Sequence, residues 1–152
     1  MITKIIKTDD GIVAFILRIT LGVVIFAHGA QKLLGIWGGH GIEWTVEAWN
    51  QWWQIPSILT YSVIFIESFG ALLLILGVLT RVWAFLIGLI MLVAIYLVHF
   101  QWGFYMNWYM KPQTGEGFEY HLLVLTIITV LLIKGGGKWS LDLSHHRKQA
   151  SL

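Results

Sequence analysis

The residues best suited to chemistry in this sequence are ionisable side chains inside long apolar stretches. His28 and Lys32 stand in one such stretch, and Glu67 stands near the middle of a second. Ionisable groups in hydrocarbon are costly, so they usually face a bundle interior or a wet cavity and mark a site. Histidine and glutamate can relay protons. We therefore predict Glu67 and His28 as the catalytic, proton-exchanging groups.

Other polar residues join this set from the remaining apolar stretches. His28 and Lys32 are four residues apart, which places them on one helix face with Gln31 adjoining. Polar groups also occur where the third apolar stretch ends and in the first turn of the fourth. In the predicted bundle these positions and His28 and Lys32 all lie in the outer half of the membrane. Arg18 lies deeper, about ten residues from His28 at 1.5 Å per residue. The candidate ligand-binding residues are Arg18, Gln31, Lys32, His99, Glu119 and His121.

This cluster suits a lipophilic ligand with polar ends, such as a quinone. A quinone needs an apolar slot, aromatic walls, hydrogen-bond partners for its oxygens and a proton relay for its reduction. Two alternatives stay open. The polar set could be structural, with Glu67 and Arg18 neutralising each other or other helices, so that the chain is a non-catalytic binding or assembly module.

The second alternative is a metal site. Imidazole and carboxylate groups from His28, His99 and His121 with Glu67 or Glu119 suit iron, zinc or copper. No HxxxH or ExxH pair on one helix supports such a site, so we predict no metal ligands. Haem is disfavoured because Lys32 stands beside His28.

Composition indicates one membrane-embedded domain over residues 1–152. Hydrophobic residues make up 57% and charged residues 12%, against roughly 25% charged in soluble domains, and the mean hydropathy is +0.74. The net charge of +2 is small, so nucleic-acid binding has no support. The absence of cysteine excludes disulfides, thiolate metal sites and Fe–S ligation by this chain.

The apolar pattern predicts an all-α fold, a bundle of four transmembrane helices. The expected spans are residues 12–34, 57–79, 82–100 and 118–133. Between the first two, residues 43–54 mix tryptophan with acidic and amide residues, which predicts an amphipathic helix in the headgroup layer on the outer side. Residues 138–152 read as a polar tail.

Basic residues set the expected orientation, because Lys and Arg concentrate in cytoplasmic segments. The N-terminus, the second connection and the tail are rich in them, whereas the first and third connections are poor. Both termini and the tail are therefore expected in the cytoplasm, and Arg81 is expected to be only a cytoplasmic flank. The residues counted are Lys4, Lys7, Arg81, Lys134, Lys138, Arg147 and Lys148.

In these motifs the chain resembles the DoxX family of small four-helix membrane proteins. The resemblance covers nearly the whole chain, because the motifs follow one another in the family's order through all four spans. The matching segments are residues 17–22, 27–33, 67–71, 76–81, 94–99, 117–122 and 137–142.

The resemblance implies a subunit of a quinol oxidase or a thiosulfate:quinone oxidoreductase in a bacterial cytoplasmic membrane. The His28-Gly29-x-x-Lys32, Glu67 and Glu119-x-His121 positions match, so the polar set carries over. It implies a quinone or quinol as cofactor, membrane lipid and an oxidoreductase subunit as partners, and room for a homo-oligomer. Because cysteine is absent, thiosulfate chemistry would have to run on the substrate or on a partner. Other relatives resemble assembly factors without chemistry of their own.

Overall fold

The computed structural model describes residues 6–150 of the chain, with side chains up to Arg147. Within this range the chain is helical and has no strand. Lys4 and the side chain of Lys148, both used above to set the orientation, lie outside the described part. The helices are α2 (Ile12–Leu34), α3 (Ile42–Trp53), α4 (Ser57–Phe65), α5 (Ala71–Leu76), α6 (Thr80–Ala94), α7 (Glu119–Lys134) and α8 (Leu141–Ala150).

Three helical stretches of the described chain are long and apolar enough to cross a membrane. They are Ile12–Leu34, Ser57–Leu76 and Thr80–Trp102, with mean hydropathies of 2.1, 2.1 and 2.4. The first has the predicted bounds. The second ends three residues before residue 79, because Gly77 adopts a left-handed conformation and terminates the helix. α7 has 16 residues and so rises about 24 Å.

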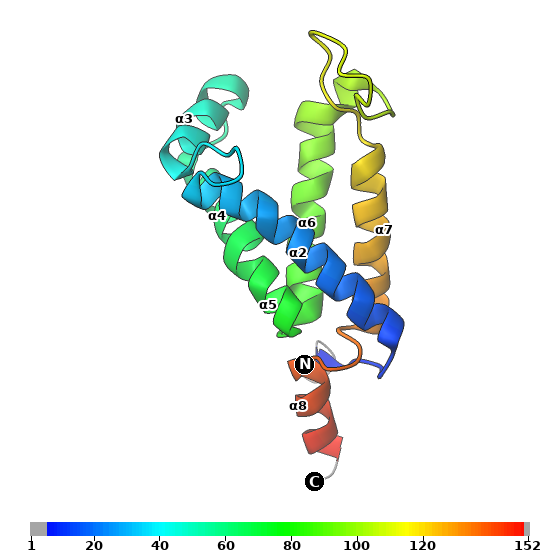
Figure 1. Ribbon diagram of the computed structural model, residues 1–152. Helices are drawn as coiled ribbons and strands as arrows, with labels where there is room; N and C mark the ends of the chain where they lie inside the picture. The colour runs from blue at the N-terminus through cyan, green and yellow to red at the C-terminus, as the bar shows by residue number, and fades with distance from the viewer. Residues whose placement is uncertain (1–5, 151–152) are drawn as a thin grey trace.

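α2 crosses the α4–α5 stretch obliquely, while α6 and α7 stand side by side (Figure 1). Their facing sides form one apolar core that includes Leu21, Leu74, Ile87 and Leu131. α2 comes close to the α4–α5 stretch at Gly22 and Gly29. A Cβ atom on Gly22 would collide with Ile75 and the Ala71 carbonyl, and one on Gly29 with the backbone of Glu67 and Ser68.

The two ends of the molecule differ in character. α3 and the loop over residues 103–117 lie at one end, which we call the α3 end; α8 lies at the other end with the first described residues (Figure 1). Trp37, Trp44, Trp52, Trp102 and Trp108, at the α3 end, are all well exposed. The first described residues and α8 therefore lie at the same end of the molecule, opposite the exposed tryptophans.

The C-terminal segment is more than the polar tail that the sequence suggested. α8 forms there, and Ser140, Asp142 and Leu143 before and within it are buried. The Asp142 carboxylate accepts hydrogen bonds from the backbone N–H groups of Leu79 and Thr80, both at 2.8 Å. It therefore neutralises the otherwise unpaired N–H groups where α6 begins. Short-range periodicity gave no sign of this capping, because the partners are more than 60 residues apart.

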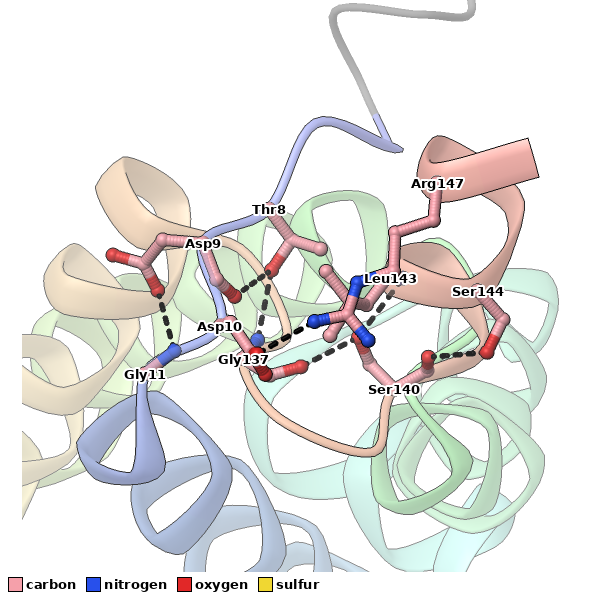
Figure 2. Close-up of polar contacts among 9 residues, drawn as sticks. All are labelled: Thr8, Asp9, Asp10, Gly11, Gly137, Ser140, Leu143, Ser144 and Arg147. Atoms are coloured by element: carbon pink, nitrogen blue, oxygen red, sulfur yellow. Dashed lines mark hydrogen bonds and ion pairs between the residues drawn. The ribbon is translucent and has the colours of Figure 1, made fainter. Parts of the chain in front are cut away.

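Hydrogen bonds also tie the C-terminal segment to the start of the chain (Figure 2). The N–H of Gly137 donates to the Thr8 hydroxyl at 2.8 Å, and Arg147 pairs with Asp10 at 2.6 Å. The interpretation of Arg81 as a mere flank is wrong. Its guanidinium donates to the carbonyls of Leu132 and Ile133, at 2.7 and 2.9 Å, and so caps the last turn of α7.

Candidate functional site

An ion pair between Lys32 and Glu67 forms the centre of the site. Lys32 lies in the last turn of α2, and Glu67 lies in the continuous helix formed by α4 and α5. Glu67 is only 4% exposed. The two backbones come close enough for this contact because Gly29, one turn before Lys32, has no side chain between them. The indole ring of Trp49 lies 5.9 Å from the Lys32 ammonium.

Within residues 6–150 the helices widen into a π-helical turn at two places, and each turn holds a candidate site residue. Ile66–Gly70 joins α4 to α5 and contains Glu67. Ile95–His99 follows α6 and ends at His99. π-Helical turns inside α-helices occur frequently at functional sites, because the extra residue redirects the neighbouring side chains. Sequence periodicity did not reveal either turn.

Beside the ion pair the protein has a cleft of about 840 Å³. Its walls come from α2, α3, α4, the Ile66–Gly70 turn, α6 and the start of α7. Leu59 of α4 and Leu89 and Val93 of α6 line it and are about half exposed, at 54%, 44% and 51%. The cleft therefore opens between α4 and α6, and the side chains at its opening are apolar. A cleft of this size falls within the range of small-molecule sites.

One wall of the cleft carries a row of imidazole and phenol rings. The ring centroids of His99 and His121 are 4.1 Å apart, those of Tyr120 and His121 are 5.6 Å apart, and those of His28 and Tyr120 are 6.5 Å apart. His99 Nδ1 lies 2.8 Å from the Glu116 carbonyl oxygen. The Tyr120 hydroxyl and His121 Nδ1 are buried without a hydrogen-bond partner. Such orphaned polar atoms are unfavourable unless something else pairs with them.

The structure brings five of the candidate residues to the cleft: His28, Lys32, Glu67, His99 and His121. Gln31 and Glu119 do not line it. The Gln31 amide donates to the Trp37 carbonyl at 2.9 Å. Glu119 accepts a hydrogen bond from the Trp108 indole at 2.7 Å and so fastens the loop over residues 103–117.

Arg18 lies away from the cleft, toward the α8 end. Its side chain is fully buried and donates to the carbonyl oxygens of Leu74, Ile75 and Lys138. These carbonyls lie at the end of α5 and in the chain before α8. Arg18 therefore caps the C-terminal end of α5 and does not pair with Glu67, the partner that the structural alternative suggested for it.

Sequence reasoning missed several residues of the cleft. Tyr120 was not selected, although it stands directly between two candidate residues, Glu119 and His121, in the sequence. Trp and Tyr residues were expected as walls in general terms only. The lining residues outside the candidate set include Trp49, Trp53, Met106, Glu116 and Tyr120.

The structure gives the metal alternative no support. Within the described residues, no group of three or more His, Asp or Glu side chains is arranged to hold a metal ion. The rings of His99 and His121 lie close together, tilted by 46° to each other, and the Glu67 carboxylate already pairs with Lys32.

Comparison with known proteins agrees with this architecture. The DoxX family model matches residues 13–100. A curated protein of Bacillus subtilis (strain 168), "Putative oxidoreductase CatD", is 28% identical over 117 residues, which cover 77% of this chain and 75% of that protein. No solved structure matches the chain. The family match spans more than half of the sequence and includes His28, Lys32, Glu67 and His99, and the chain therefore belongs to the DoxX family of membrane proteins.

Proposed function

We propose that this protein is a membrane subunit that binds a quinone, a quinol or a similar lipophilic ligand in the cleft and supports a membrane oxidoreductase. The observation that carries the proposal is the form of the cleft. Apolar side chains line its opening between α4 and α6, whereas the ion pair and the row of His28, Tyr120, His121 and His99 line its interior. A ligand with a polar ring and an apolar body matches this division.

In this proposal each polar residue of the cleft has a distinct role. Glu67 and His28 exchange protons with the ring oxygens, and Lys32 holds an anionic form of the ring. Tyr120 and His121 offer the hydrogen-bonding atoms that have no partner within the protein. His99, with its ring against His121, connects the cleft to the exposed loop that carries Glu116.

The oxidoreductase part of the proposal is supported by the similarity to the Bacillus subtilis protein described as a "Putative oxidoreductase". In this proposal a separate partner subunit supplies or removes the electrons. Because this chain has no cysteine, any thiosulfate chemistry would run on the substrate or on that partner. We also propose that α7 completes a four-span bundle, that α3 lies in the headgroup layer, and that both termini face the cytoplasm of a bacterial cell. Reporter fusions at the α8 end and in the loop over residues 103–117 test this orientation.

The experiment that tests the ligand is purification in mild detergent, followed by extraction and mass spectrometry of lipids, quinones and metals. We expect a quinone to copurify stoichiometrically with the wild-type protein and to be lost from the Glu67→Gln and His28→Ala variants. Glu47→Gln is the matched control, because Glu47 is an exposed acid on α3 that does not line the cleft. Arg81 is unsuitable as a control because it caps α7.

A second function class remains, a non-catalytic partner or assembly module, and one observation favours it. The loop over residues 103–117 is held by hydrogen bonds of Asn107 to Lys111 and Thr114, and it presents Trp108 and Tyr109, which are 73% and 88% exposed. Exposed aromatic side chains on an ordered loop suit a protein interface. A preparation that contains no quinone and no metal but brings down a stoichiometric partner protein would favour this module.

A further inference from the structure

A second, apolar hollow of about 440 Å³, largely open to the surface, adjoins the cleft. It lies between α4 and α6 and is lined by Tyr61, Phe65 and Trp83, together with three residues that also line the cleft: Ser62, Ile66 and Leu86. Three shared lining residues mean that the two hollows meet. The function proposed above uses only the polar interior of the cleft and leaves this hollow unexplained.

The cleft and the second hollow together form one continuous groove that follows α6 and the Ile95–His99 turn after it. Trp83, Leu86, Ile90, Ala94 and Leu97 follow one another at intervals of three or four residues, so they lie on one face of the helix. From Trp83 to Leu97 this face is about 21 Å long at 1.5 Å per residue. One end of the groove reaches the ring-lined wall of the cleft, and the other lies between Trp83 of α6 and Tyr61 and Phe65 of α4.

The chemistry of the groove changes along its length. Near α7 it has imidazole, phenol and charged groups. Toward Trp83 the lining is apolar apart from the hydroxyls of Tyr61 and Ser62 and the indole N–H of Trp83. The Ser62 hydroxyl is already used, because it donates to the Ile58 carbonyl at 2.7 Å. Phe65 is half exposed, at 51%, and stacks on Phe69 with 5.4 Å between ring centroids. This end therefore offers apolar contact along an open side and little hydrogen bonding.

We propose that the ligand of the cleft is a long-chain amphiphile whose single hydrocarbon chain lies in this groove between α4 and α6 and runs toward Trp83. An isoprenoid quinone has this form, whereas a compact lipophile without a chain leaves the second hollow empty. This inference rests on the proposed function and adds to it the class of the ligand and the direction of its chain.

The test is photolabelling of the purified full-length protein with two probes. One is decylubiquinone with a diazirine at the end of its chain, and the other is a ubiquinone with an azide on its ring. We expect the chain-end probe to label peptides over residues 57–66 and 80–90, and the ring probe to label α7. Excess unmodified decylubiquinone should remove both labels.

Two variants locate the chain. Leu86→Trp fills the junction of the two hollows, so it should abolish chain-end labelling near Trp83 and leave ring labelling in place. Leu92→Trp is the matched control, because Leu92 is an exposed residue of the same helix that lines neither hollow, and it should change neither label. Leu86→Phe is the milder substitution if Leu86→Trp does not fold.

The outcomes separate the two proposals. Suppose that excess decylubiquinone removes the ring label, but the chain-end probe labels the lipid-facing side of α2 or α7. This result overturns the groove as the place of the hydrocarbon chain and leaves the proposed ligand site in place. Chain-end labelling near Trp83 that excess quinone and Glu67→Gln leave unchanged means that bulk lipid fills the groove, and it also overturns this inference. Loss of competition for both probes overturns the proposed function and the inference together.

Discussion

Lys32 and Glu67 are 35 residues apart in the sequence and form an ion pair where α2 passes the π-helical turn between α4 and α5. Their side chains are 22% and 5% exposed. A pair this deep costs desolvation free energy that its attraction does not always repay, so its presence is weak evidence for stability alone. It stands at the inner end of an apolar cleft, where a charged pair can meet a ligand.

The pair predicts a specific pattern of stability among variants. Glu67→Gln leaves the Lys32 ammonium without its counter-ion, and we expect the free energy of unfolding in detergent to fall by about 2 kcal/mol, less than for a fully buried pair because Lys32 is partly exposed. The double variant Lys32→Met, Glu67→Gln removes both charges and should recover most of the loss. Thermal unfolding of the purified variants measures this.

The same variants separate structure from ligand binding. We expect the double variant to be stable but to contain no quinone after purification. If it retains quinone at the wild-type ratio, the pair is structural and the ligand site lies elsewhere. A double variant as unstable as Glu67→Gln alone would contradict the account of the pair as an electrostatic unit.

Gly29 predicts a steric effect at the same crossing. In Gly29→Ala the new methyl group would collide with the backbone of Glu67 and Ser68, which cannot move aside as a flexible side chain can. We expect a loss of about 2 kcal/mol in unfolding free energy together with loss of the ligand. Gly88→Ala is the control, because its methyl group would meet only the side chain of Ile128. Equal effects of the two substitutions would contradict the close crossing.

For Arg18 we expect substitutions to change stability without changing the amount of bound ligand. Arg18→Leu removes the donor from the carbonyls of Leu74 and Lys138, and we expect unfolding free energy to fall by about 3 kcal/mol. Arg18→Lys should lie between, since one ammonium cannot reproduce the guanidinium fork. Arg147→Leu, which breaks an exposed pair with Asp10, should cost less than about 1 kcal/mol.

The measurement for Arg18 is the quinone content per folded protein, taken at a temperature where all variants are folded. We expect it to equal that of the wild type. A selective loss of quinone from Arg18→Leu would return Arg18 to the ligand-binding set, where the sequence alone had placed it.

How much of the fold was predictable follows from the kind of signal involved. Hydropathy and length located the span that starts at Ile12 and the helix around Trp49, because both depend on local sequence. α8 was missed because its buried contacts are with residues far away in the chain. Asp142 reads as an ordinary polar residue in the sequence, and only the fold shows that its carboxylate caps the start of α6.

The site was predictable to the extent that burial cost indicates it. Lys32 and Glu67 stood out because a charge in an apolar stretch needs a reason, and the structure pairs them. Arg18 stood out for the same reason, yet its partners are backbone carbonyls, which no sequence pattern identifies. Glu119 lies next to a cleft residue, Tyr120. Adjacent residues of a helix point in different directions around its axis, so Glu119 reaches Trp108 while Tyr120 lines the cleft.

Tyr120 gives the last prediction, in which stability and affinity respond in different ways. Its hydroxyl is buried without a partner in the protein, so Tyr120→Phe removes an unsatisfied group and should leave the unfolding free energy unchanged or slightly raised. If that hydroxyl pairs with a ligand oxygen, the affinity for decylubiquinone should fall about fivefold, which corresponds to one neutral hydrogen bond of about 1 kcal/mol.

Quenching of tryptophan fluorescence measures this affinity, because Trp49 and Trp53 line the cleft. Tyr96→Phe is the control, since Tyr96 lies in the Ile95–His99 turn, is 81% exposed and lines neither hollow. A Tyr120→Phe protein that is less stable and binds as tightly as the wild type would mean that the hydroxyl serves the fold. Tyr120 would then not belong to the ligand site. The oxygens of the quinone ring would have to be recognised by His28, His121 and the Lys32–Glu67 pair alone.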